Sequence, residues 1–112
     1  MQGSVTSIAW DDEVIVCGYT DGACDVFSCD TKEYVTTLSD TQEDIHYASS
    51  KVILGKNVIP MIAYGCDQAG RIGKCSIGIW TKTDFKQIYS TVLESGRDPV
   101  YLQEHSNSVF IW

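Results

Sequence analysis

The stretch Val5–Leu38, VTSIAWDDEVIVCGYTDGACDVFSCDTKEYVTTL, decides the fold. It contains four short runs that are rich in Val, Ile, Thr, Tyr and Trp, and Asp, Gly or Ser residues separate one run from the next. This pattern is typical of strands joined by turns, and no apolar residues recur at the helical spacing of three and four. The stretch therefore predicts four antiparallel strands.

Local features of this stretch support a sheet that needs a neighbour. Gly22 follows Asp21 and allows the positive φ of a tight turn between the second and third strands. The run Val14–Cys17 is apolar on both faces, which predicts a strand covered on both sides. A single four-stranded sheet cannot bury both of its faces, so we expect it to stack on similar sheets.

The order of these strands and turns resembles one blade of a WD40-type β-propeller. Asp21 and Gly22 stand where that family has its Asp-Gly turn, and Phe27 stands where the family usually has Trp. No Gly-His pair precedes Val5, and no Trp-Asp dipeptide is present at Phe27, so the hydrogen-bond network of the family is not carried over. The resemblance implies an all-β fold built from antiparallel four-stranded blades as part of a β-propeller.

The rest of the chain predicts one further unit and the start of a third. The polar segment 39–44, SDTQED, is a loop, and the segment after it predicts short strands at Ile45–Ala48 and Val52–Leu54 in preference to a helix. We expect a single partial propeller domain over 1–112, with units at about 4–39 and 45–93 and an incomplete third unit from 99. The resemblance is close over 5–38 and loose over 58–93.

The second unit can be aligned with the first in two registers. One register matches Cys75 with Phe27, and the other matches Trp80 with Phe27 and places extra residues between Gly65 and Trp80. Pro60 lacks a backbone donor, so we expect it at the first residue of its strand or on an edge.

Charge is distributed unevenly. The chain has 15 acidic and 8 basic residues and a net charge of −7, and the only base among residues 1–50 is Lys32. An acidic half repels nucleic-acid phosphates and anionic lipid, so we expect neither nucleic acid nor membrane as a partner.

The five cysteines predict free thiols. Their number is odd and no two have the spacing of a zinc site, so we expect buried thiols in a reducing compartment. The start MQGSVTS has neither the basic nor the apolar segment of a signal peptide, and no run reaches the ~20 apolar residues of a membrane span. These features predict a cytoplasmic or nuclear protein.

Residues for chemistry are few. The glycines of GCDQAGRIG do not form a phosphate-binding motif, and no motif arranges His46 or His105 with Cys24, Cys66 or Asp67. The carboxylates of 40–44 lack the alternation of a calcium loop. The sequence therefore predicts no catalytic residue, no metal and no cofactor. Four aromatic residues in apolar runs are expected in the core: Trp10, Phe27, Tyr64 and Trp80.

The WD40 resemblance implies a rigid, non-catalytic scaffold for protein partners. In that family the loops between second and third strands and the loops between units share one rim, here 19–22, 39–44, 67–71 and 94–98. On charge complementarity we expect the partner to contact Asp40, Glu43, Asp44, Arg71 and Arg97.

Two other functions stay open. One is a fragment of a propeller hydrolase or oxidoreductase whose active site needs blades absent here, although the first strand offers only Thr6 and Ser7 as polar groups. The other is a partial propeller that assembles with copies of itself. In each case further blades, from a longer chain or from a homo-oligomer, are expected to cover the apolar strand SVFIW near the end.

Overall fold

The chain is built from strands and turns. The computed structural model describes residues 3–67, 73–95, 102–105 and 108–111, and within these ranges it contains no helix, hence none that could cross a membrane. The strands are β1 (Val5–Trp10), β2 (Val14–Tyr19), β3 (Cys24–Ser28), β4 (Tyr34–Leu38), β5 (His46–Val52), β6 (Val58–Cys66), β7 (Gly73–Thr81), β8 (Gln87–Ser95), β9 (Leu102–His105) and β10 (Ser108–Ile111). The predicted all-β class is confirmed.

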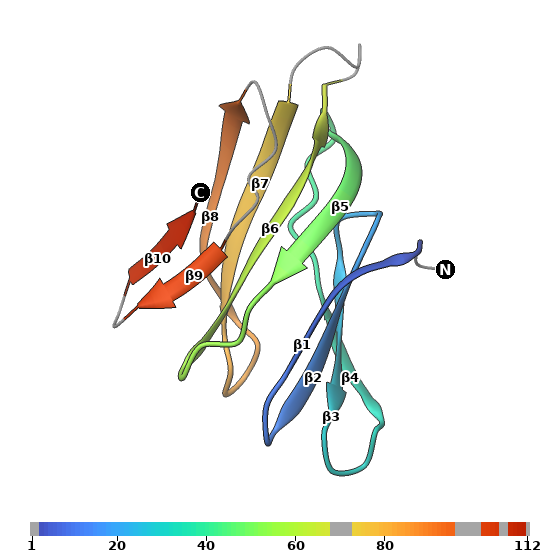
Figure 1. The fold of residues 1–112 in the computed structure, drawn as a ribbon, viewed down its shortest axis with the longest axis vertical. Helices are drawn as coiled ribbons and strands as arrows, with labels where there is room; N and C mark the ends of the chain where they lie inside the picture. The colour runs from blue at the N-terminus through green and yellow to red at the C-terminus, as the bar shows by residue number, and fades with distance from the viewer. Residues whose placement is uncertain (1–2, 68–72, 96–101, 106–107, 112) are drawn as a thin grey trace.

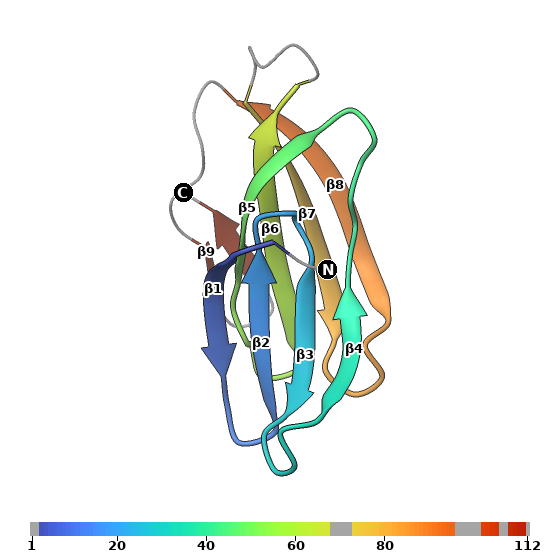
Figure 2. The same cartoon turned by 90° about the vertical axis from the view of Figure 1, so that its right-hand side faces the viewer.

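The first eight strands form two antiparallel sheets. Strands β1 to β4 pair in chain order to form sheet A, and β5 to β8 pair in chain order to form sheet B. Figure 1 shows the two sheets as neighbouring layers, with the β9–β10 hairpin on the side of sheet B away from sheet A. One face of sheet A packs on sheet B, and the opposite face of sheet A is turned toward the viewer in Figure 2. We call it the open face of sheet A, because no described element covers it.

The main core lies between the two sheets. Alternation in β2 turns Val14 and Val16 toward sheet B, and Trp80 meets them from β7 with 4% of its surface exposed. The indole of Trp80 extends over Gly78, where an added Cβ would lie 2.4 Å from the ring. The core members are Val14, Val16, Cys24, Val26, Leu38, Val52, Ile59, Met61 and Trp80.

In both sheets the same turn joins the third strand to the fourth. After β3 and after β7, the backbone N–H of the last strand residue donates to the carbonyl five residues later, at 2.9 Å in each case. The fourth residue after each strand has a positive φ, 64° at Lys32 and 56° at Phe85. Phe27 and Trp80 are the next-to-last residues of these strands. The two units therefore repeat in the register that matches Trp80 with Phe27, with the extra residues in longer central strands.

Two expectations about strands need correction. In place of separate strands at 45–48 and 52–54 the chain forms one strand, β5, which runs only from His46 to Val52, since its pairing with β6 continues through a bulge between Tyr47 and Ser49. Pro60 is an interior residue of β6, between β5 and β7. The carbonyl of Pro60 accepts a hydrogen bond from the N–H of Ile53, which lies just beyond the end of β5. The backbone N–H that proline lacks would point to the same side, where the pairing with β5 has already ended.

Burial of the first sheet also differs from expectation. Trp10 was expected in the core and is 71% exposed. Within the run Val14–Cys17, Val14 and Val16 are buried, whereas Ile15 and Cys17 are only half-buried. Trp10, Ile15 and Cys17 are exposed or half-buried for the same reason. Side chains alternate along a strand, and these three point to the open face, where no described layer packs.

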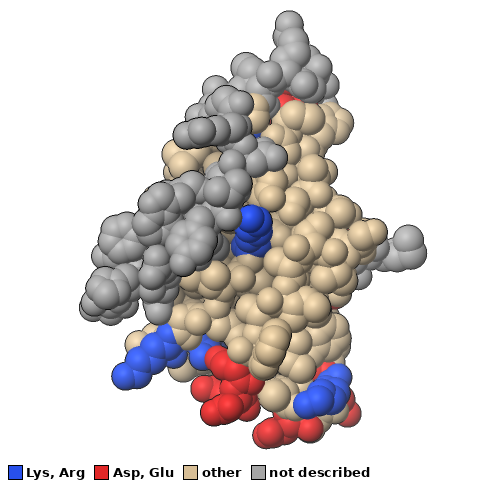
Figure 3. All heavy atoms as spheres, viewed as in Figure 1, with Lys and Arg blue, Asp and Glu red and all other residues tan. Residues whose placement is uncertain are grey.

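The exposed acidic residues of sheet A lie in its turns. Figure 3 shows acidic side chains together at the lower end of the molecule, where Figure 1 places the β1–β2 and β3–β4 turns. The exposed acids of this sheet are Asp12, Glu13, Asp21, Asp30 and Glu33. The apolar open face is thus bounded by negative charge at its ends.

Candidate functional site

An apolar row crosses the open face of sheet A from one edge to the other. Residues directly opposite one another on paired strands share a face of the sheet. The register pairs Trp10 with Ile15, Ile15 with Phe27, and Phe27 with Tyr34. The rings of Phe27 and Tyr34 meet edge to face, with centroids 6.2 Å apart. One aromatic or aliphatic side chain from each of the four strands therefore forms a continuous strip.

A second row beside it contains a carboxylate. Here the register pairs Ile8 with Cys17, Cys17 with Asp25, and Asp25 with Thr37. Asp25 is only 6% exposed, and its Oδ1 accepts a hydrogen bond of 2.7 Å from Thr37 Oγ1. The hydroxyl of Thr37 lies 2.7 Å from that of Tyr34. This network satisfies a buried carboxylate and joins the two rows, so the face has a defined side-chain arrangement.

Tyr19 extends the network at the other end of the face. Burial and the neighbouring Asp25 carboxylate, to which Tyr19 is hydrogen-bonded, raise the pKa of Tyr19 to about 12. The hydroxyl of Tyr19 is therefore protonated and donates to Asp25 at any physiological pH.

The open face exposes large side chains. The exposed fractions are 71% for Trp10, 58% for Tyr34, 55% for Ile8 and 52% for Val5. Scattered apolar residues on a surface are ordinary, but a contiguous set with aromatic members is typical of an interaction site. Because Trp and Tyr are the residues that most often dominate binding energy at interfaces, Trp10 and Tyr34 are the strongest candidates for contact.

The thiols near this face have raised pKa values. Burial and the charge of Asp25 raise the pKa of Cys17, and burial raises the pKa of Cys24 to about 12. Cys24 also lies in the core, with its sulfur 2.8 Å from that of Met61. A cysteine nucleophile needs its thiolate, so neither residue is prepared for covalent chemistry.

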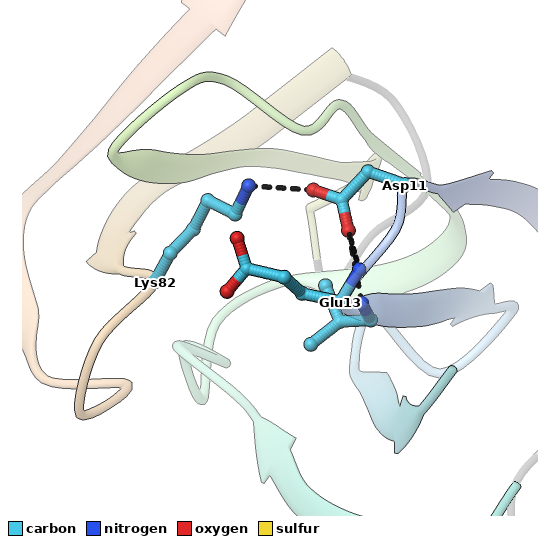
Figure 4. Close-up of polar contacts among 4 residues, drawn as sticks. Asp11, Glu13 and Lys82 are labelled. Carbon is cyan, nitrogen blue, oxygen red and sulfur yellow. Dashed lines mark hydrogen bonds and ion pairs between the residues drawn. The ribbon is translucent and has the colours of Figure 1, made fainter. Parts of the chain in front are cut away.

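An ion pair holds the two sheets together at the acidic end. Lys82 Nζ lies 2.5 Å from Asp11 Oδ2, and Figure 4 shows this contact together with the bonds that Asp11 Oδ1 accepts from the backbone N–H groups of Glu13 and Val14. Burial opposes ionisation of Asp11, but these hydrogen bonds outweigh it and hold the pKa of Asp11 below its ordinary value of 3.8. The turn after β1 is therefore fixed to the turn after β7.

The predicted rim residues lie elsewhere. Asp40 Oδ2 accepts a hydrogen bond of 2.5 Å from Ser90, and Asp44 pairs with Lys74 at 2.8 Å, so both connect the β4–β5 loop to sheet B. Glu43 is exposed in the same loop and interacts within the chain. Arg71 and Arg97 lie outside the described residues. A partner contact at these five positions stays a prediction.

Possible catalytic residues are only partly brought together. His46 lies directly opposite Cys66 on β5 and β6, close to Asp67, whereas Cys24 is in the core and His105 has no described side chain. Among the residues whose placement is described, no group of three or more His, Cys, Asp or Glu side chains is arranged to hold a metal ion.

Sequence reasoning missed the open face because it assumed that the first sheet is covered on both sides. The signal was nevertheless present. Ile8 and Trp10 are two residues apart, as are Ile15 and Cys17, so each pair lies on one face of its strand. Pairing the two strands outward from the turn between them sets Trp10 opposite Ile15 and Ile8 opposite Cys17.

Comparisons with known proteins give no relative. No protein-family model matches the chain, and no curated protein matches its sequence. Among solved structures, the crystal structure of the computationally designed Ika4 protein aligns with 100% of this chain and 92% of its own, at 13% sequence identity and a TM-score of 0.48. A likeness of this degree carries no argument about family or function.

Proposed function

We propose that this chain is a non-catalytic scaffold for protein–protein interaction, a partial propeller of the WD40 type that works in the cytoplasm or nucleus. The observation that carries the proposal is the open face of sheet A, where Trp10, Ile15, Phe27 and Tyr34 form one strip across four strands. The free thiols among the described residues support a reducing compartment.

The partner binds to the open face by packing on its aromatic residues. Sheet A is already rigid, because its inner face is packed on sheet B and its buried carboxylate is satisfied. A rigid surface binds without the entropic cost of ordering, which favours affinity. The raised pKa values of Cys17 and Cys24 support a binding role over a catalytic one.

The proposal is tested by affinity capture from cells with matched variants. Tyr34→Lys places a charge on the open face, and Val92→Lys places the same charge on β8, where Val92 is 41% exposed. A protein recovered by the wild type and by Val92→Lys, and lost with Tyr34→Lys, is the expected result. If Tyr34→Lys retains every protein that the wild type retains, the open face is not the docking surface.

A further inference from the structure

A groove runs between the two sheets along the free edge of β1. Strand β1 pairs with β2 on one side, and no described strand pairs with its other side. Near its start, β1 is fixed to β5, because Thr6 Oγ1 lies 2.9 Å from the carbonyl oxygen of Ser50 and 3.1 Å from its nitrogen. Past this contact the groove opens, with a volume of about 390 Å³. Its lining residues are Ile8, Ala9, Trp10, Val52, Ile53 and Leu54.

This edge lacks the usual protection against strand pairing. Edge strands in native proteins commonly carry a charge, a proline or a bulge that discourages a further strand. The segment Ser7–Trp10 has neither charge nor proline, and the bulge of β1 lies before it, between Val5 and Ser7. The segment therefore offers backbone donors and acceptors to an extended chain, beside a groove that accepts apolar side chains.

The charge at the end of the groove selects the occupant. The turn directly after Trp10 carries Asp11, Asp12 and Glu13, of which Asp11 is paired with Lys82 while Asp12 and Glu13 are exposed. The β5–β6 turn opposite carries one base, Lys56, which interacts within the chain. The excess of carboxylates favours basic side chains and disfavours the acidic sheet A of a second copy.

We infer that the groove is a peptide-binding site in which an extended, basic segment of a protein partner adds as a strand to β1. Its apolar residues enter the groove between Ala9 and Leu54, which both pack against the core, and its Lys or Arg residues lie beside Asp12 and Glu13. This site deepens the proposed function and rests on it, because it names the chemistry of one contact of a protein-binding scaffold.

The test uses short labelled peptides and fluorescence anisotropy with the whole chain. The probe alternates Lys with Val or Leu, a second peptide has Glu in place of Lys, and a third is the Lys peptide methylated on alternate backbone nitrogens. We expect the Lys peptide alone to bind well, because only it has both the charge and the free backbone N–H groups. Equal binding of the Glu peptide or of the methylated peptide overturns the inference.

Variants locate the binding site. Leu54→Ala shortens one wall of the groove and should weaken binding of the Lys peptide by about tenfold, about 1.4 kcal/mol. Val35→Lys charges β4, the opposite edge of the same sheet, and should leave binding unchanged. Loss of binding with Val35→Lys, or no loss with a folded Leu54→Ala, places the peptide elsewhere and contradicts the inference.

The two proposals fail separately. Tyr34→Lys alters the open face and not the groove, so it should abolish capture of the whole partner while the Lys peptide still binds. Absence of peptide binding with capture intact refutes the groove alone. A dimer of the chain that Leu54→Ala dissociates would show that a second copy occupies the groove, which also contradicts the inference.

Discussion

Two tryptophans of similar sequence context have opposite environments. Trp80 is 4% exposed within the core between the sheets, and Trp10 is 71% exposed on the open face. Trp80→Ala should lower the free energy of unfolding by about 3–5 kcal/mol, since it leaves a large cavity. Trp10→Ala should change it by less than about 0.5 kcal/mol. Urea unfolding of both variants checks this, and a large loss with Trp10→Ala would show that the open face is covered.

Gly22 is a position where both backbone and space require glycine. Its φ is +88°, and an added Cβ would lie 2.8 Å from the ring of Tyr47 on β5. Gly22→Ala should therefore destabilise the fold by about 2 kcal/mol or more. Gly22→Asn serves as the control, because Asn tolerates positive φ but carries the same Cβ. Recovery of stability with Asn would show that φ alone matters and that the contact with Tyr47 does not.

At the scale of single residues, sequence reasoning located the Asp-Gly turn and the buried Trp80 correctly. It placed Trp10 in the core because a short apolar run contains no information about which layer faces it. Phe27 and Tyr64 were also expected in the core for this reason, and both rings are only half-buried. Burial at these positions depends on how sheets stack, which is a property of distant parts of the chain.

Strand ends are connected by polar contacts whose strength depends on pH. The pKa of Asp11 is lowered in the folded state, so its stabilisation is complete above its ordinary pKa of 3.8 and is lost as the pH falls through the folded value. Asp11→Asn should cost about 1 kcal/mol at neutral pH. The difference from the wild type should shrink at pH values below 3.8.

Urea unfolding across this acidic range checks the prediction. Asp12→Asn is the matched control, because Asp12 is exposed in the same turn. A difference between wild type and Asp11→Asn that persists unchanged in acid would show that the ion pair with Lys82 does not hold the sheets together.

At the scale of elements, the four strands of 5–38 followed from their residues, because each run is bounded by turn formers. The alignment of the second unit with the first did not follow from the residues, since β6 and β7 are nine residues long and the two units can be matched in two registers. The backbone turn shared by β3 and β7 resolves the alignment, and its positive φ at Lys32 and Phe85 has no signature in these residue types. The sequence also did not indicate that Asp40 and Asp44 bind Ser90 and Lys74 within the chain, because these two partners come from distant strands.

At the scale of the whole molecule, the open face of sheet A lies between acidic turns. Charges of one sign oppose the approach of the same face of another copy, whereas a basic partner is attracted. Raising the salt concentration should weaken binding of the Lys peptide to the groove, because the carboxylates of Asp12 and Glu13 are exposed and screened. Binding that is independent of salt would show that apolar contact alone selects the peptide.

The solution mass of the purified chain, measured by light scattering on wild type and Tyr34→Lys, tests the central claim most directly. The account predicts a folded monomer of 12.4 kDa in both samples, because the occupant that we propose for the open face is a different protein. A defined oligomer of the wild type that Tyr34→Lys dissociates would contradict it, since a second copy of the chain would then be the occupant of the face.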